Sequence, residues 1–429
     1  MKNTRSLRYS SYQPSFDRDT AHRKLRNNKG RSIQQNIVAS LVWPFLFAVE
    51  DLFTFPKRRA VIGFVLFCGF AGLTFFPQFG SDGFTYASKI YWGFGAEGIN
   101  EPITAFLINM VSFSGFGYHF YFMLLGLIYA ALVSWSAYLL FSDLPVNKTY
   151  STATAVFMLA FFLNHPVFAA LNARYQLSLW VMLLSTILIL KGRWQISLCI
   201  ALMGTMIHFG HSIFFLALVL LLLSRKLGKV QIIFAYVMLV VAIFLPSSLL
   251  LTLGDTFAHY LGGSFSEKVS NTAKIVQQNK LLSTGEGSED SKWFMVWFEI
   301  PIFYSLLFTG HMLVWKIRNH QSDPQFQLWI LIIFMWALQF AMRGDSEGAG
   351  RVERNNLALL LMWHARWFLY RRQGKYFALF INIAPMIFYF IIAFRRDLND
   401  VHSGTFLPSF FSYFTGFMPT VQGFFKLFH

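Results

Sequence analysis

Charged residues are scarce in this sequence of 429 amino acids: Asp, Glu, Lys and Arg together make up only 13%. About 25% of the residues of an ordinary soluble domain are charged. Apolar residues make up 55% of the chain, and the mean hydropathy is +0.48. The composition therefore excludes an ordinary soluble domain and indicates a membrane protein.

Cysteine is also scarce, and several familiar catalytic motifs are absent. Cys68 and Cys199 both lie within apolar stretches, which excludes a disulfide scaffold, and no Cys/His cluster suggests a metal site. The chain has no glycine-rich phosphate-binding loop ending in Lys-Ser or Lys-Thr, so an ATP-driven motor is not expected. The Gly-x-Ser-x-Gly motif of serine hydrolases is absent too. Any chemistry must come from isolated polar residues.

Long apolar runs, in contrast, recur along the chain. A helix needs roughly 20 apolar residues to cross the hydrocarbon core of a bilayer. We therefore predict an all-α fold, a polytopic transmembrane helical bundle of about eleven spans (roughly 10–13). The candidate spans are residues 60–77, 103–141, 150–165, 177–190, 194–208, 213–223, 230–253, 293–315, 326–342, 355–369 and 376–394.

The positive charge of the chain has two interpretations. A formal net charge of +16 could indicate nucleic-acid binding, but the basic residues do not gather on one face. Short basic loops mark the cytoplasmic side of a membrane protein, and they attract anionic lipid. We therefore interpret the charge as a topology signal and expect no nucleic-acid partner. The basic turns are Lys57-Arg58-Arg59, Lys191 with Arg193, Arg225-Lys226 with Lys229, Lys316 with Arg318, and Arg371-Arg372 with Lys375.

Placing the basic turns in the cytoplasm orients the rest of the chain. The segment 78–101, Arg174, the turn from His208 to His211, the long loop 254–292 and the segment 343–354 then all lie outside. This orientation depends on the Lys and Arg turns alone. The polar segments nevertheless converge on one side of the membrane.

The two ends of the chain differ from its apolar middle. Residues 1–35 are polar and basic and lack the apolar region of a signal peptide, so we expect a disordered cytoplasmic arm. Residues 36–56 are apolar but hold Glu50 and Asp51, which favours an interfacial helix. Residues 57–397 form the expected transmembrane domain, and residues 398–429 form an amphipathic aromatic tail.

The first candidate site residues precede and open the long run 103–141. Gly115-Phe116-Gly117 interrupts this run, so we predict a short re-entrant or kinked half-helix followed by one crossing. Proline is favoured in the first helical turn, which places Glu101 at the N-cap before Pro102. Glu101 either only caps the helix and complements its dipole, or accepts a proton during catalysis. Asp82, in a segment that ends at Tyr86, has the same two interpretations.

Arg174 and a histidine pair form the next candidates. Cations are costly at membrane depth and usually face a cavity or a ligand, although Arg174 could instead extend to the interface. Arg174-Tyr175 opens one apolar run, and His208 and His211 follow the next run. Buried histidines often only pack, but two on a short turn between spans, downstream of an arginine, favour a site for an anionic ligand.

A third set of candidates lies in the glycine-rich acidic segment 342–354. It carries Arg343, Arg351 and Arg354. Guanidinium groups match phosphate oxygens in a bidentate manner, and glycine lets a ligand approach the backbone closely. The alternative is internal pairing of these arginines with Glu347 and Glu353.

These residues, in this order, resemble the EpsG-like and Wzy-type polysaccharide polymerases. The resemblance rests on Asp82 to Tyr86, Glu101-Pro102, Arg174 before a span, a basic turn, a span that ends at His208, and Gly350-Arg351 before a late span. It covers roughly residues 80–223 and, more loosely, 350–361. One departure is that Phe79-Gly80-Ser81 stands where the family has an arginine before the first aspartate.

The resemblance implies an integral-membrane glycosyltransferase of the bacterial inner membrane, with a GT-C-like polymerase or ligase architecture. Its substrate would be an oligosaccharide linked to undecaprenyl diphosphate, and it would need no metal or nucleotide cofactor. The acceptor hydroxyl of one repeat unit would attack the anomeric carbon of another, with inversion. Partners would be membrane lipid, the lipid-linked oligosaccharide and, for chain-length control, a regulator protein. Two alternatives stay open: an O-antigen ligase or other lipid-linked glycan transferase, and a flippase or transporter for lipid-linked glycan.

The reaction suggests roles for the candidate residues. Preorganised arginines stabilise a departing anion in a site of low dielectric, so we expect Arg174 and Arg351 to bind the diphosphate. Either His208 or Glu101 would deprotonate the acceptor hydroxyl. Asp82 and Arg354 would orient the sugar or partner side chains. The remaining substrate-binding candidates are Tyr86, Tyr175, His211 and Arg343.

Overall fold

The computed structural model of the chain describes residues 33–54, 62–77, 79, 81–141, 167–172, 174–245, 300–317, 322–342 and 346–371. Within these ranges the fold is helical and contains no β-strand, in agreement with the predicted fold class. The following predicted features lie outside the described residues: nearly all of the N-terminal arm, the spans 150–165 and 376–394, the loop 254–292, the tail 398–429 and Arg343.

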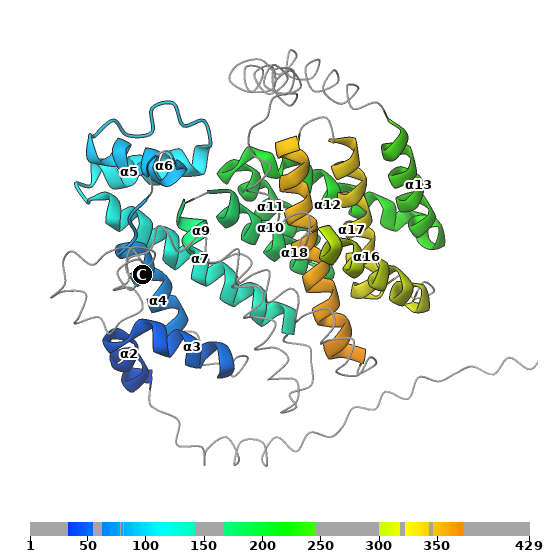
Figure 1. Ribbon diagram of the computed structural model, residues 1–429, viewed down its shortest axis with the longest axis horizontal. Helices are drawn as coiled ribbons and strands as arrows, with labels where there is room; N and C mark the ends of the chain where they lie inside the picture. The colour runs from blue at the N-terminus through cyan, green and yellow to red at the C-terminus, as the bar shows by residue number, and fades with distance from the viewer. Residues whose placement is uncertain are drawn as a thin grey trace, which may run out of the picture.

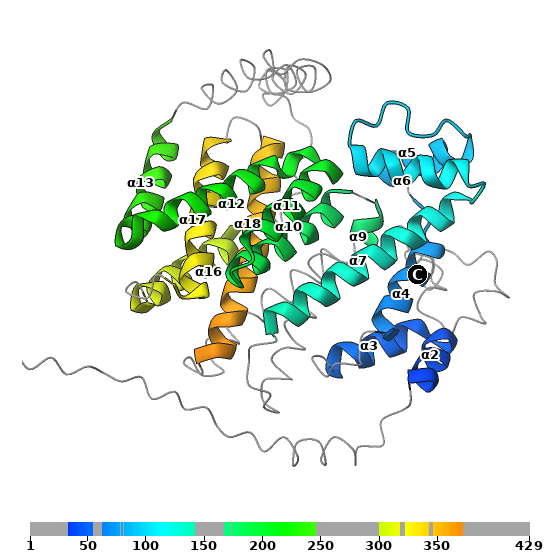
Figure 2. The ribbon, with the colours of Figure 1, turned by 180° about the vertical axis from the view of Figure 1, so that it is seen from behind.

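Figures 1 and 2 show two groups of helices that meet along α7 and α10. The first group consists of α2 (Ile33–Val42), α3 (Pro44–Thr54), α4 (Ile62–Leu73), α5 (Asp82–Tyr91), α6 (Pro102–Phe113), α7 (Tyr118–Phe141) and α9 (Val167–Asn172). The second consists of α10 (Arg174–Leu190), α11 (Trp194–Ile207), α12 (Ser212–Ser224), α13 (Gln231–Phe244), α16 (Ile300–Val314), α17 (Pro324–Ala341) and α18 (Ser346–Arg371), with 3-10 turns η1 (Phe209–His211), η2 (Arg225–Val230) and η4 (Trp315–Ile317). Helices α10 and α17 are buried on nearly all faces and form the core of the second group.

Glycines let α4 and α7 pack backbone to backbone. A Cβ at Gly126 of α7 would clash with the carbonyl oxygen of Cys68 in α4, and a Cβ at Gly72 of α4 would clash with the carbonyl oxygen of Phe122. Small residues allow helices in membranes to approach closely, and dispersion contacts then hold them together. This crossing supports α5 and α6, which lie beside each other at one end of the molecule (Figure 1).

The predicted break in the run 103–141 is confirmed. Helix α6 ends at Phe113, Gly115 adopts a left-handed backbone with φ of 74°, and α7 begins at Tyr118. Pro102 occupies the first turn of α6 and Glu101 is its N-cap, as predicted. The amide oxygen of Asn109 accepts a hydrogen bond from the Ala96 N–H at 2.7 Å, which ties α6 to the loop before it.

Helices α10 and α11 form a hairpin held by hydroxyl groups. Its turn contains Gly192 with φ of 78°. The Ser178 hydroxyl donates a hydrogen bond to the Gly204 carbonyl at 2.7 Å, and the Ser185 and Ser197 hydroxyls lie 2.7 Å apart. Buried side-chain hydrogen bonds of this kind join neighbouring helices in membranes. The hairpin places the first residue of α10, Arg174, beside the end of α11.

Three stretches of the described residues are long and apolar enough to cross a membrane: Tyr118–Leu140, Phe209–Phe244 and Pro324–Ala341. The second of these bends at Gly228, with φ of 55°, so that α12 and α13 are separate helices. Shorter apolar helices accompany them at Ile62–Leu73, Pro102–Phe113, Arg174–Leu190, Trp194–Ile207 and Phe303–Val314. The length and apolar composition of these helices indicate a membrane protein.

Two boundaries differ from the prediction. The interfacial helix expected at 36–56 is two helices, α2 and α3, because Pro44 lacks an N–H and starts a new helix. The segment from Ser346 to Arg354, expected in a loop, forms the first turns of α18. Glycines at 348 and 350 lower the helix propensity of this segment, but packing of α18 against Tyr175 outweighs that local cost.

The glycine crossing predicts that Gly126→Ala will destabilise the protein. The added methyl group cannot fit without moving the α4 backbone, and overpacking of this kind costs about 1–3 kcal/mol. We expect a lower thermal midpoint in detergent and less protein in the membrane. Gly117→Ala is the matched control, because a Cβ there meets no atom within 4 Å. Equal thermal midpoints for the two variants would contradict the close crossing.

Candidate active site

Several helix ends come together beside α10. The start of α6, the start of α10, the end of α11 and the turn η1 before α12 contribute Glu101, Arg174, His208 and His211. The second turn of α18 adds Arg351. Helix N-termini carry partial positive charge, so the starts of α6, α10 and α12 favour an anion at this location.

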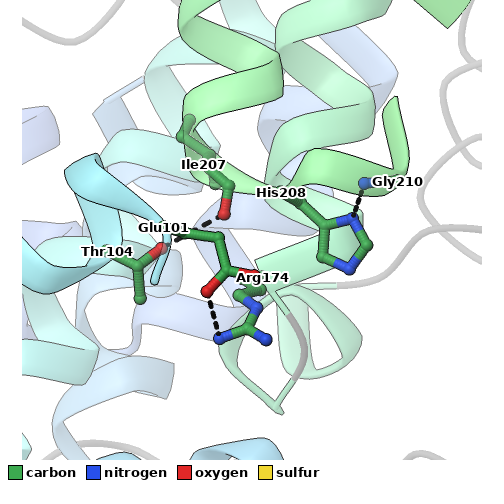
Figure 3. A network of polar contacts seen from close by, with 6 residues as sticks. All are labelled: Glu101, Thr104, Arg174, Ile207, His208 and Gly210. Atoms are coloured by element: carbon green, nitrogen blue, oxygen red, sulfur yellow. Dashed lines mark hydrogen bonds and ion pairs between the residues drawn. The ribbon is translucent and has the colours of Figure 1, made fainter. Parts of the chain in front are cut away.

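Glu101 and Arg174 form an ion pair at the centre of this group. Nη1 of Arg174 lies 3.1 Å from Oε2 of Glu101, and the two side chains are 21% and 4% exposed. The Glu101 side chain makes no capping hydrogen bond to its own helix, although it occupies the N-cap position. Figure 3 shows the pair with its surroundings. The Glu101 side chain therefore pairs with Arg174 and does not cap α6.

Tyr86 and Thr104 support the ion pair from two sides. The guanidinium carbon of Arg174 lies 5.7 Å from the centre of the Tyr86 ring, a cation–π arrangement. Burial raises the pKa of the Tyr86 hydroxyl well above its ordinary value, so this hydroxyl stays neutral and can donate a hydrogen bond. The Thr104 hydroxyl donates to the Ile207 carbonyl at 3.2 Å, which joins α6 to the end of α11 (Figure 3). Tyr86 and Thr104 line a small cavity together with Arg174.

Tyr175, the residue after Arg174, organises a second cluster. Its ring stacks on His211 with centroids 4.6 Å apart, and the His208 ring meets its edge at 5.5 Å. The guanidinium carbon of Arg351 lies 6.0 Å from the centre of the Tyr175 ring. Two arginines therefore meet at the start of α10. Arg174 is the first residue of the helix, and Arg351 lies over the ring of the second residue, Tyr175.

The His208 ring is oriented by its own backbone turn. Its Nδ1 accepts a hydrogen bond from the Gly210 N–H at 3.1 Å. A neutral imidazole has one N–H and one acceptor nitrogen, so the proton of neutral His208 lies on Nε2. A Cβ at Gly210 would lie 2.7 Å from Cε1 of His208 and 3.8 Å from Nη1 of Arg351, so both side chains reach this turn.

The other predicted residues lie at the edge of the group. Asp82 is exposed in the first turn of α5, where Ser81 is the N-cap. Arg354 is exposed on α18. Within the described part of the chain, no group of three or more His, Cys, Asp or Glu side chains could hold a metal ion.

Asn355 belongs to the site although the sequence analysis did not single it out. It is 2% exposed, and its Oδ1 lies 2.6 Å from the Tyr175 hydroxyl. A signal was present: Asn355 follows Arg351 by four residues, so the two share one face of a helix. Expecting a loop before residue 355 concealed this spacing.

Comparison with known proteins identifies a family. The model of the EpsG family matches residues 59–411, a range that contains every candidate residue from Asp82 to Arg354. No curated protein and no solved structure gives a match.

The ion pair predicts a stability effect that is separable from activity. Arg174→Ala leaves the buried Glu101 carboxylate without its partner, which we expect to cost about 1–3 kcal/mol because Arg174 is partly exposed. Adding Glu101→Gln removes the unpaired charge, so the double variant should regain most of the thermal midpoint but no activity. A double variant less stable than Arg174→Ala would contradict the pairing. Glu97→Gln, an exposed change on the preceding loop, serves as control.

Proposed function

Because the chain belongs to the EpsG family, a family of Wzy-like polysaccharide polymerases, we propose that it joins oligosaccharide repeat units carried on undecaprenyl diphosphate. The product is a surface polysaccharide such as O-antigen, capsule or exopolysaccharide. The reaction is a single displacement at the anomeric carbon of the donor, and it inverts the configuration there. The bond to the diphosphate breaks as the bond to the acceptor oxygen forms.

The placement of two arginines around the start of α10 carries this proposal. Arg174 opens the helix, and Arg351 lies over Tyr175, the next residue. Two guanidinium groups beside helix N-termini suit the two phosphates of a departing lipid diphosphate, whose charge grows as the bond breaks. The negative charge of the leaving group is stabilised by these residues of the chain.

Glu101 is the best-placed base. In the resting state its carboxylate pairs with Arg174. When the diphosphate binds, it competes for the guanidinium and leaves the carboxylate to accept the proton of the acceptor hydroxyl. The pairing therefore couples donor binding to deprotonation.

His208 is better suited to donate a hydrogen bond than to accept a proton. Its Nδ1 already accepts the Gly210 N–H, and Nε2 carries the proton of the neutral ring. We therefore assign Nε2–H of His208 to a substrate oxygen and Glu101 to the base. The neutral hydroxyl of Tyr86 and the exposed Asp82 and Arg354 remain candidates for orienting sugars.

We propose that the site faces outward from a bacterial cytoplasmic membrane. The basic residues Lys191 and Arg193 lie in the turn at the opposite end of α10, and Arg225, Lys226 and Lys229 lie in the turn between α12 and α13. Such turns are cytoplasmic by the positive-inside rule. The site then lies on the outer side, within a bundle of about eleven spans with a GT-C-like architecture.

Surface glycan of cells carrying Arg174→Ala tests the proposed function. We expect chains reduced to a single repeat unit, and Arg174→Lys should recover little because an ammonium cannot form the planar bidentate contact. Arg193→Ala, at the opposite end of α10, should leave the chain-length distribution unchanged. Loss of the first repeat unit from its acceptor would instead indicate a ligase, and intracellular accumulation of the donor would indicate a flippase.

The assignment of Glu101 as the base predicts different losses of rate for the Glu101 and His208 variants. Glu101→Gln should lower the rate about 10²–10⁴-fold, the usual share of general acid–base catalysis. His208→Gln keeps an N–H donor, so we expect a smaller loss and an unchanged shape of the pH–rate profile. If His208 were the base, the wild-type rate would fall as acid pH protonates the imidazole, and His208→Gln would abolish that dependence.

Single cysteines test the orientation. In a Cys199→Ser background, in which the remaining Cys68 is buried, Glu97→Cys should react with a membrane-impermeant maleimide in intact spheroplasts. Lys229→Cys should react only after permeabilisation. The reverse pattern would place the site on the cytoplasmic side.

A further inference from the structure

The hydroxyl of Tyr175 makes two short contacts with α18. It lies 2.6 Å from the backbone carbonyl oxygen of Arg351 and 2.6 Å from Oδ1 of Asn355. Tyr175 and Asn355 are buried, at 8% and 2% exposure. Arg351 and Asn355 lie one helical turn apart on α18, and they follow Tyr175 in the sequence by 176 and 180 residues. The two contacts therefore link α10 to a distant segment of the chain.

The single proton of the Tyr175 hydroxyl limits the hydrogen bonds that it can donate to Arg351 and Asn355. A hydroxyl has one proton, so it cannot donate to two oxygens at full strength. The amide of Asn355 satisfies both contacts when its NH2 group faces Tyr175: the amide then donates to the hydroxyl, and the hydroxyl donates to the Arg351 carbonyl. A directed chain of hydrogen bonds then runs from the Asn355 amide through the Tyr175 hydroxyl to the backbone carbonyl of Arg351.

This chain controls where the Arg351 side chain begins. Its guanidinium lies over the Tyr175 ring and reaches the turn at Gly210. Arg174 precedes Tyr175 directly, so the same residue of α10 sets the position of both cations. The spacing of two cations decides how well they match the two phosphates of one ligand.

We infer that the Tyr175 hydroxyl and the Asn355 amide form a brace that sets the distance between Arg174 and Arg351 for an isoprenyl diphosphate. Both are positioning residues, which act through Arg351 and do not need to touch the ligand. This assignment rests on the proposed function and adds Asn355 to it. Tyr175, expected from the sequence to contact the substrate, acts here by fixing a cation.

A double-mutant cycle tests the brace by direct binding. Farnesyl diphosphate is the probe, and its Kd for purified protein is measured by titration calorimetry in detergent. Tyr175→Phe keeps the ring and removes only the hydroxyl, and we expect binding about 10-fold weaker, the scale of one or two lost hydrogen bonds. In an Arg351→Ala background the same change should have no further effect, because the brace acts through Arg351. Asn355→Ala should behave in the same way.

Tyr236→Phe is the matched control. The Tyr236 hydroxyl on α13 lies 2.5 Å from Nδ1 of His311, away from the site, so its removal also deletes a tyrosine hydrogen bond. It should lower the thermal midpoint about as much as Tyr175→Phe and leave the Kd unchanged. Additive losses in the Arg351→Ala background, or an unchanged Kd for Tyr175→Phe, would overturn the brace while the proposed function stands. A wild-type protein that does not bind the probe, although it polymerises repeat units, would overturn the diphosphate site and the brace together.

Discussion

The ion pair between Glu101 and Arg174 is the interaction on which the site depends. Each charge would be costly alone in a largely buried position, and each makes the other tolerable. The pair also fixes the start of α6 against the start of α10. The Thr104 hydrogen bond to the end of α11 and the Tyr86 ring under the guanidinium hold the same arrangement from outside.

The same pair explains how a site without a bound anion can stay folded and yet be ready for one. An anion that binds Arg174 would replace the Glu101 carboxylate as its partner. The guanidinium would then keep a negatively charged partner throughout. The second cation, Arg351, is held separately by α18 and Tyr175. In the proposed mechanism one arginine therefore exchanges partners while the other stays fixed, as the binding and release of a diphosphate require.

The sequence predicted the features that local rules control. Apolar run lengths indicated a helical membrane protein, Pro102 placed Glu101 at a helix start, and glycines at 115 and 117 located the break before α7. It could not predict contacts that depend on tertiary packing: the pairing of Glu101 with Arg174, the Gly210 bond that selects the His208 tautomer, and the role of Asn355. The helix at Ser346 was also missed, because its glycines favour a loop locally and the tertiary packing of α18, which includes the contact with Tyr175, outweighs them.

We propose that the protein polymerises a lipid-linked glycan without a metal ion or a nucleotide. The most direct test is purified protein in lipid vesicles, supplied with undecaprenyl-diphosphate repeat units, a chelator and no nucleotide. Chain growth and release of undecaprenyl diphosphate are measured together. We predict longer chains with one diphosphate lipid released for each bond formed. Chains that do not grow under these conditions, from folded protein that still binds the donor, would contradict the account.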